Sequence, residues 1–147
     1  MTKPAALSRD AYPHFLTIPT RWMDNDVYGH VNNVVYYSYF DTVVNEYLLR
    51  IGMLDFESSE AIGLVVETQC HYFASLAFPD RIEAGLRIAK IGNSSVQYEI
   101  GLFREGDTEP AAQGRFVHVY VDRATRRPRA LSEANRSALE PLASIPV

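Results

Sequence analysis

Hydrophobic residues recur with two different periods along the chain, and the change of period separates its predicted elements. Residues 14–22 are rich in β-branched and aromatic side chains and predict a first strand, in which Pro19 indicates an edge position or a bulge. From Asn33 onward apolar residues recur every three or four positions, which predicts an α-helix. Asn32 or Asn33 suits the N-cap of this helix, and Gly52 suits its end. The apolar stripe comprises Tyr36, Phe40, Val43, Tyr47 and Ile51.

Beyond this helix apolar and polar residues alternate, and the period of two predicts four half-buried strands. Short turn-forming segments separate the strands, so we expect each strand to pair antiparallel with the next one in the chain. Ser132 is placed to cap a short final helix, which Pro141 would end. The four strands lie within residues 64–73, 82–89, 96–103 and 116–121.

One long helix and one antiparallel sheet predict an α+β domain in which the sheet curls around the helix. We expect a single domain over residues 1–147, with 1–13 as a loose arm and 130–147 as a short C-terminal helix and tail. A single sheet leaves part of the helix and one sheet edge uncovered. Dimerisation is the simplest way to cover both.

Composition narrows the function classes. The 147 residues are 47% hydrophobic with a formal net charge of −4, so we expect no nucleic-acid partner. The sequence has neither a signal-peptide run nor a membrane-length apolar stretch, so we expect a cytoplasmic protein without a membrane partner. The four histidines lack metal-ligand spacing and no phosphate loop is present, so we expect no metal and no cofactor.

Residues 21–33 carry the candidate chemistry. Asp24 and Asp26 follow the first strand, and Asn33 begins the helix seven residues after Asp26. A helix N-terminus offers unpaired N–H groups that can polarise a carbonyl, and Gly29 permits a turn that brings a carboxylate beside them. The carboxylate would then act as base or nucleophile. Asp and Asn beside Gly are also ordinary turn and cap residues, which is the structural alternative.

The run Asp24-x-Asp26-x-x-Gly29-His30-Val31-Asn32-Asn33, continued by Tyr36-Tyr37-x-x-Phe40-Asp41, resembles the signature of the 4-hydroxybenzoyl-CoA thioesterase family. The order of elements over residues 14–125 is also similar. The resemblance implies a hotdog fold, with a five-stranded antiparallel sheet around a central helix, and an acyl-CoA thioesterase that forms a homodimer or homotetramer. It implies that Asp26 is the catalytic carboxylate, as nucleophile or general base, and that the Asn33 N–H polarises the carbonyl.

The resemblance also suggests secondary roles. Asp24, Gly29, His30 and Asn32 would support the site, but Asp24 suits a turn better, and His30 suits an exposed or capping position equally well. Candidate contacts to acyl-CoA are Tyr36, Tyr37, Phe40, Glu67, Arg126 and Arg127. The aromatic residues suit the core as well, and Arg87, Lys90, Arg104 and Arg115 are alternative phosphate ligands.

Two other functions stay open at this point. One is a hotdog hydratase or dehydratase, which would pair His30 with Asp26. The other is a non-catalytic module that binds acyl thioesters. The acyl group, and the choice between CoA and acyl-carrier protein, are also open.

Overall fold

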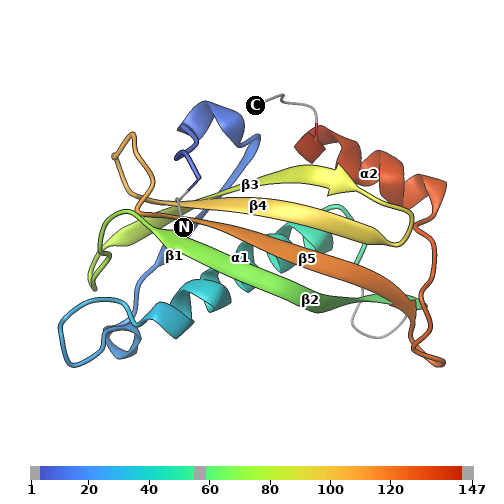
Figure 1. The fold of residues 1–147 in the computed structure, drawn as a ribbon, viewed down its shortest axis with the longest axis horizontal. Helices are drawn as coiled ribbons and strands as arrows, with labels where there is room; N and C mark the ends of the chain where they lie inside the picture. Colours follow the sequence, from blue (N-terminus) through green and yellow to red (C-terminus); the bar gives the residue numbers. More distant parts are fainter. Residues whose placement is uncertain (1–3, 55–58, 144–147) are drawn as a thin grey trace.

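A computed structural model describes residues 4–54 and 59–143 and arranges them as one sheet with two α-helices on one of its faces (Figure 1). Short 3-10 helices at Arg9–Ala11 and Trp22–Asp24 flank the first strand. The main elements are β1 (His14–Pro19), α1 (Asn33–Arg50), β2 (Ala61–Tyr72), β3 (Arg81–Ile91), β4 (Ser95–Arg104), β5 (Ala112–Asp122) and α2 (Glu133–Ala143).

The sheet has the order β1-β3-β4-β5-β2, and every neighbouring pair is antiparallel. The predicted pairing of consecutive strands is correct for β3–β4 and β4–β5 but wrong for β2 and β3. The chain crosses from one side of the sheet to the other between them, and β2 pairs with β5 instead. Among the described strands β1 pairs with β3 alone, so Pro19 lies on an edge strand, as predicted. With α1 packed on one face, this topology confirms the hotdog fold.

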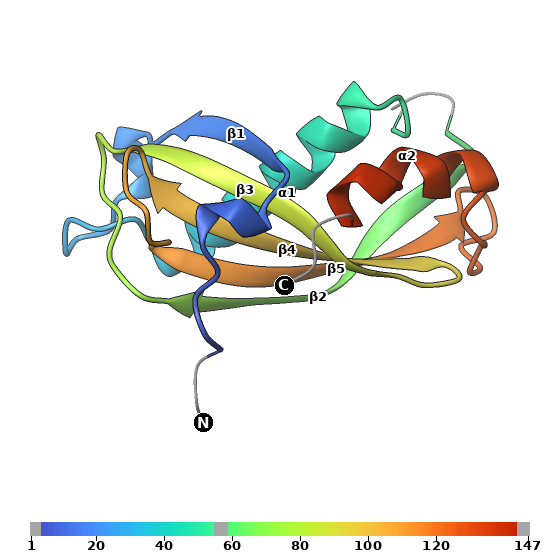
Figure 2. The same ribbon diagram turned by 90° about the horizontal axis from the view of Figure 1, so that it is seen from above.

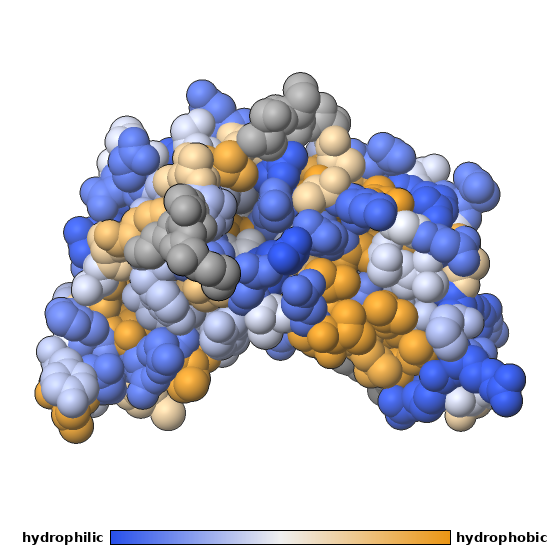
Figure 3. Space-filling model, viewed as in Figure 1, coloured by the Kyte–Doolittle hydropathy of each residue, from blue (hydrophilic) through white to orange (hydrophobic). Residues whose placement is uncertain are grey.

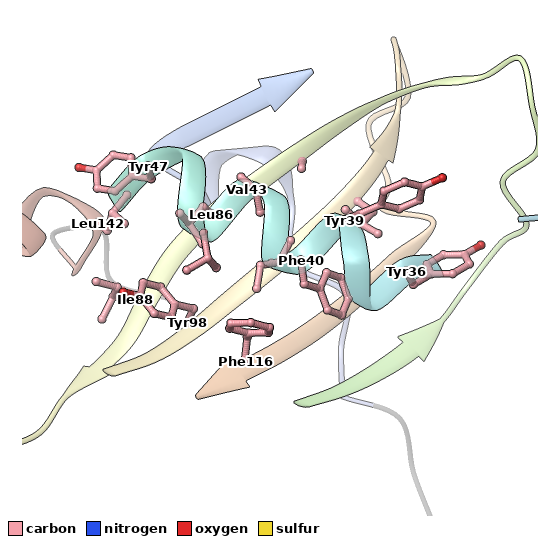
Figure 4. Close-up of a cluster of buried hydrophobic side chains, with 14 of the residues drawn as sticks. Tyr36, Tyr39, Phe40, Val43, Tyr47, Leu86, Ile88, Tyr98, Phe116 and Leu142 are labelled. Carbon is pink, nitrogen blue, oxygen red and sulfur yellow. The ribbon is translucent and has the colours of Figure 1, made fainter. Parts of the chain in front are cut away.

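α1 forms where the sequence predicts it. The Asn32 side chain caps it by accepting a hydrogen bond from the Val34 N–H (3.2 Å), and Gly52 adopts a left-handed φ of +77° just beyond its end. Its apolar stripe packs against side chains that rise from the sheet, as Figure 4 shows. The buried helix residues are Tyr36, Tyr39, Phe40, Val43, Val44, Tyr47 and Leu48. Burial of this stripe holds the N-terminus of α1 against one end of the sheet.

The N-terminal arm was expected to be loose, but its described residues pack against the sheet. Residues 4–13 pack on the face of the sheet opposite α1 (Figure 2). Tyr12 is 4% exposed and fills a recess over Gly85 and Gly101, where an added Cβ would lie 2.8 Å from its ring. The Leu7 N–H donates to Gln113 Oε1 (2.8 Å). The recess exists only because β3 and β4 pair these two glycines, so local sequence does not reveal it.

The first strand and the last helix depart from their predicted ends. β1 stops at Pro19 because residues 22–24 turn into a 3-10 helix. Ser132 caps α2 as predicted, by accepting the Asn135 N–H (3.1 Å), but Pro141 does not end the helix, which continues to Ala143. Burial of Leu139 and Leu142 beside the core stabilises this last turn despite the hydrogen bond that proline cannot donate. Residues 144–147 of the expected tail lie outside the described residues.

Candidate active site

A buried carboxylate anchors the loop that joins β1 to α1. Asp24 is 1% exposed, and its Oδ1 accepts hydrogen bonds from Arg21 Nε (3.1 Å) and Nη2 (2.9 Å). Its Oδ2 accepts from the Arg21 backbone N–H (2.9 Å) and from the Tyr39 hydroxyl (2.8 Å). Because Tyr39 belongs to α1, Asp24 fixes the loop to the helix.

This environment sets the charge of Asp24. Burial raises the pKa of its carboxyl, but hydrogen bonds from the Arg21 N–H, the Tyr39 hydroxyl and the Arg21 guanidinium outweigh burial and hold the pKa below its ordinary value. Burial and the bond to Asp24 raise the pKa of Tyr39. Asp24 is therefore an ionised structural anchor whose two oxygens are already engaged by protein donors.

Asp26 lies in a tight turn a few residues further on. Its N–H donates to the His30 carbonyl (2.8 Å), and its own carbonyl accepts from the Gly29 N–H (3.1 Å). Gly29 has a φ of +81°, which explains the glycine at this position. One carboxylate oxygen accepts the Tyr28 N–H (2.8 Å). The other accepts no hydrogen bond from the part of the chain that the structure describes.

Asn32 engages two of the first N–H groups of α1. The Asn32 side chain accepts the Val34 N–H (3.2 Å), and the Asn32 carbonyl accepts the Val35 N–H (2.9 Å). Its own N–H donates to the Asp24 carbonyl (2.8 Å). Within residues 4–54 and 59–143 the Asn33 N–H has no hydrogen-bond acceptor, so one donor is left at the positive end of the helix dipole.

Asp26 and Asn33 border the same open hollow of about 470 Å³. The turn that contains Asp26 and the start of α1 form one side, and the chain at and after the end of β2 forms another. The Tyr72 hydroxyl donates to the Asn33 carbonyl (3.4 Å), and the rings of Tyr36 and Tyr72 meet edge to face at 4.9 Å. The lining residues are Asp26, His30, Val31, Asn33, Tyr36, Tyr72, Phe73, Ala74 and Ser75.

Four of the site residues expected from the sequence thus meet here: Asp26, His30, Asn33 and Tyr36. The sequence did not indicate Val31, Tyr72, Ala74 or Ser75. The available signal was the connection between β2 and β3: the eight residues between Tyr72 and Arg81 are long for a hairpin and could have suggested a crossing chain.

Other expected contacts lie elsewhere. Tyr37 packs edge to face on Phe40 (5.9 Å), and Phe40 is fully buried against Gly114 of β5. Neither residue lines the hollow. Glu67 forms an ion pair with Arg115 (3.7 Å). Because side chains alternate along β2, Glu67 lies on the face of the sheet opposite α1.

Arg126 and Arg127 occupy the loop after β5. This loop is held by backbone bonds to Asp122, which accepts the Arg126 N–H (2.8 Å) and donates to the Arg127 carbonyl (2.8 Å). In the β2–β5 ladder Asp122 pairs with Ala61, whereas the hollow adjoins Tyr72 at the other end. At about 3.3 Å per residue, roughly 35 Å separates the two ends. A single protomer does not bring these arginines to the hollow.

Neither a metal centre nor a membrane span is found in the described residues. In 4–54 and 59–143, no three His, Cys, Asp or Glu side chains are grouped so that they could hold a metal ion. None of the helices described combines the length and the apolar character needed to cross a membrane.

Comparisons with known proteins identify the family and the fold. A family model described as the thioesterase-like superfamily matches residues 20–139. YsmA of Bacillus subtilis strain 168 is 24% identical over 132 residues, which cover 89% of this chain and 88% of YsmA. The match to the thioesterase-like family model confirms the family resemblance expected from the Asp26 motif and the helix that follows it.

Solved structures are similar over most of the chain. The PA5185 protein from Pseudomonas aeruginosa strain PAO1 is 57% identical, with a TM-score of 0.91 over 95% of this chain and 97% of that one. A thioesterase from Thermus thermophilus, solved in complex with coenzyme A and Zn, is 28% identical, with a TM-score of 0.77 over 93% of this chain and 99% of that one.

Proposed function

Because the chain belongs to the thioesterase-like superfamily, whose model spans residues 20–139, we propose that it hydrolyses acyl-CoA thioesters in the hollow beside Asp26. One observation carries the proposal: the Asp26 carboxylate and the Asn33 N–H border the same hollow, and within the described part of the chain one carboxylate oxygen and this N–H have no hydrogen-bond partner. An acyl group bound in this hollow would therefore lie beside both groups.

The chemistry follows from these two groups. The Asn33 N–H donates to the thioester carbonyl oxygen and stabilises the negative charge that develops on it. Asp26 then acts by one of two routes. Its oxygen attacks the carbonyl carbon, expels the CoA thiolate and leaves a mixed anhydride that water hydrolyses; or it accepts a proton from water as that water attacks the carbon. Both routes give the free acid and CoA, and both need Asp26 ionised.

The contrast between the two aspartates supports this assignment. Asp24 is buried and fully engaged with Arg21 and Tyr39, so it has no lone pair to offer a substrate. Asp26 is half-exposed at the hollow, with one oxygen held by the Tyr28 N–H. That bond orients the carboxylate and leaves the second oxygen for chemistry. Asp24 and Asn32 support the site by holding the loop and the helix start.

CoA as the carrier is supported by the Thermus thermophilus relative, which was solved with coenzyme A. The distant position of Arg126 and Arg127 does not exclude them as phosphate ligands, because a second protomer can supply them. We propose that two copies pair along β2.

The free edge of β2 supports this pairing. β2 is twelve residues long and, among the strands that the structure describes, pairs with β5 alone, so it is an edge strand that a second copy could extend. Leu64, Val65 and Val66 on this strand are 38%, 47% and 59% exposed, and Figure 3 shows apolar surface over this part of the sheet. Antiparallel pairing of two β2 strands places the Ala61 end of one copy beside the Tyr72 end of the other. The partner's arginine loop then lies near the hollow.

A free-thiol assay with a panel of acyl-CoA thioesters tests the proposal. We expect the wild-type protein to release CoA, and Asp26→Asn to lose activity at least about 100-fold, because the amide keeps the shape and removes the base. Asp41→Asn, an exposed helix aspartate outside the hollow, is the matched control and should keep wild-type activity. Hydration of an enoyl-CoA without thiol release would identify a hydratase instead. Binding of acyl-CoA with neither product would identify a binding module.

A further inference from the structure

The connection between β2 and β3 forms one wall of the hollow, and several hydrogen bonds hold it in place. At its start the N–H groups of Phe73 and Ala74 both donate to the Ala111 carbonyl (2.8 and 3.0 Å). Further along, the Leu76 carbonyl accepts the Val31 N–H (2.7 Å). Between these two points lies Ser75, which lines the hollow and is exposed. The position of this stretch therefore depends on what holds Ser75.

Arg104, at the end of β4, provides that contact. Its Nη2 donates to the Ser75 carbonyl (2.9 Å), and its Nε donates to Asp80 Oδ2 (3.2 Å). Its Nη1 lies 3.7 Å from Asp107 Oδ2. A planar guanidinium can reach two acceptors at once in a fixed geometry, which a lysine ammonium on a flexible stem does much less well.

Asp80 extends this contact to the loop that carries Asp26. Its Oδ2 also accepts the Ala77 N–H (3.0 Å), and its carbonyl accepts the N–H (3.1 Å) and hydroxyl (2.5 Å) of Thr20. Thr20 is 6% exposed and is the first residue after β1, at the start of the loop that carries Asp24 and Asp26. Arg104 thus bonds to both segments that border the hollow, to the wall directly and to the loop through Asp80.

We propose that Arg104 is a positioning residue for the thioesterase reaction, acting through the Ser75 carbonyl and Asp80 to fix the wall of the hollow against Asp26. This inference rests on the proposed function. Arg104 lies outside the lining of the hollow, so its effect on catalysis passes through the wall. Displacement of a site wall by about 1 Å can reduce turnover by up to about 100-fold. The effect should be larger for an acyl group that fills the hollow than for an acetyl group.

Three variants test this role. Arg104→Gln removes the guanidinium, Arg104→Lys keeps the positive charge without the planar group, and Arg81→Gln is the matched control. Arg81 is also about half exposed, pairs with Glu105 (3.3 Å) and directly precedes Ile82, the residue that Arg104 faces in the β3–β4 ladder. Among the described residues, no side-chain hydrogen bond or ion pair joins Arg81 to the wall. Each variant is assayed for kcat/KM with the best substrate of the panel and with acetyl-CoA, well below its unfolding temperature.

We expect Arg104→Gln to lower kcat/KM for the best substrate about 10- to 100-fold, and for acetyl-CoA much less. Arg104→Lys should recover part of the loss, and Arg81→Gln should stay within about twofold of wild type. Partial unfolding would lower kcat/KM for both substrates by the same factor. If Arg104→Gln leaves the ratio of the two kcat/KM values unchanged, the proposal is overturned. If the wild type releases no thiol, the proposed function itself fails. If Asp26→Asn abolishes activity while the ratio is unchanged, only the role of Arg104 is wrong.

Discussion

His118 gives the clearest test of the structure outside the site. It lies on β5 with 3% of its surface exposed, surrounded by the rings of Tyr98, Phe116 and Tyr120. Its Nδ1 forms no hydrogen bond with the residues that the structure describes. Burial lowers the pKa of the imidazole from 6.5 to about 4, because the apolar surroundings disfavour the charged ring.

The sign of the pH dependence follows from this difference. In the unfolded chain His118 takes up a proton near pH 6.5, whereas in the folded protein it stays neutral down to about pH 4. Its contribution to stability is complete above about pH 6.5 and is lost as the pH falls toward 4. The pKa difference corresponds to about 3 kcal/mol in total, of which about 2 kcal/mol is lost between about pH 7 and pH 5.

Urea unfolding of the wild type and of His118→Phe at about pH 7 and pH 5 measures this contribution. Phenylalanine fits an aromatic environment and cannot take up a proton, so the variant should lose about 2 kcal/mol less than the wild type over this interval. The exposed His30 serves as the control, and His30→Gln should keep the wild-type pH dependence. Equal losses in wild type and His118→Phe would refute the reasoning. If the variant does not fold, an NMR titration of the wild-type imidazole answers the same question, and a pKa near the ordinary 6.5 would refute it.

Two further predictions concern the core and the free edge. A Cβ added at Gly114 would overlap the Phe40 ring and lie 2.8 Å from the Gln69 carbonyl, so Gly114→Ala should destabilise the fold by about 1–3 kcal/mol in urea unfolding. Adding Phe40→Leu to it should recover part of the loss, and strict additivity of the two changes would contradict the contact. If two copies pair along β2 as proposed, Val66→Lys on this exposed edge strand should shift the protein from dimer to monomer in light scattering, whereas Ala134→Lys on α2 should not. A wild type that is monomeric at high concentration would refute the pairing along β2.

The residue pattern by itself determined the elements with strong local signals. The three-and-four spacing placed α1, and Asn32 and Gly52 marked its two ends because capping depends on a few adjacent residues. Alternation of apolar and polar residues placed the later strands for the same reason. The seven-residue spacing between Asp26 and Asn33 was also local, and the structure places both at one hollow.

Tertiary structure alone decided which distant segments meet. The strand order places β2 beside β5, because pairing depends on contacts between residues far apart in the chain. That crossing brings the segment Tyr72–Ser75 to the hollow. It places the loop with Arg126 and Arg127 at the opposite end of the sheet. It also decides that Tyr12 has a recess to fill. Periodicity reports on a residue and its near neighbours, so it could indicate that Asp26 faces a helix start but not which wall encloses it or that Arg104 holds that wall.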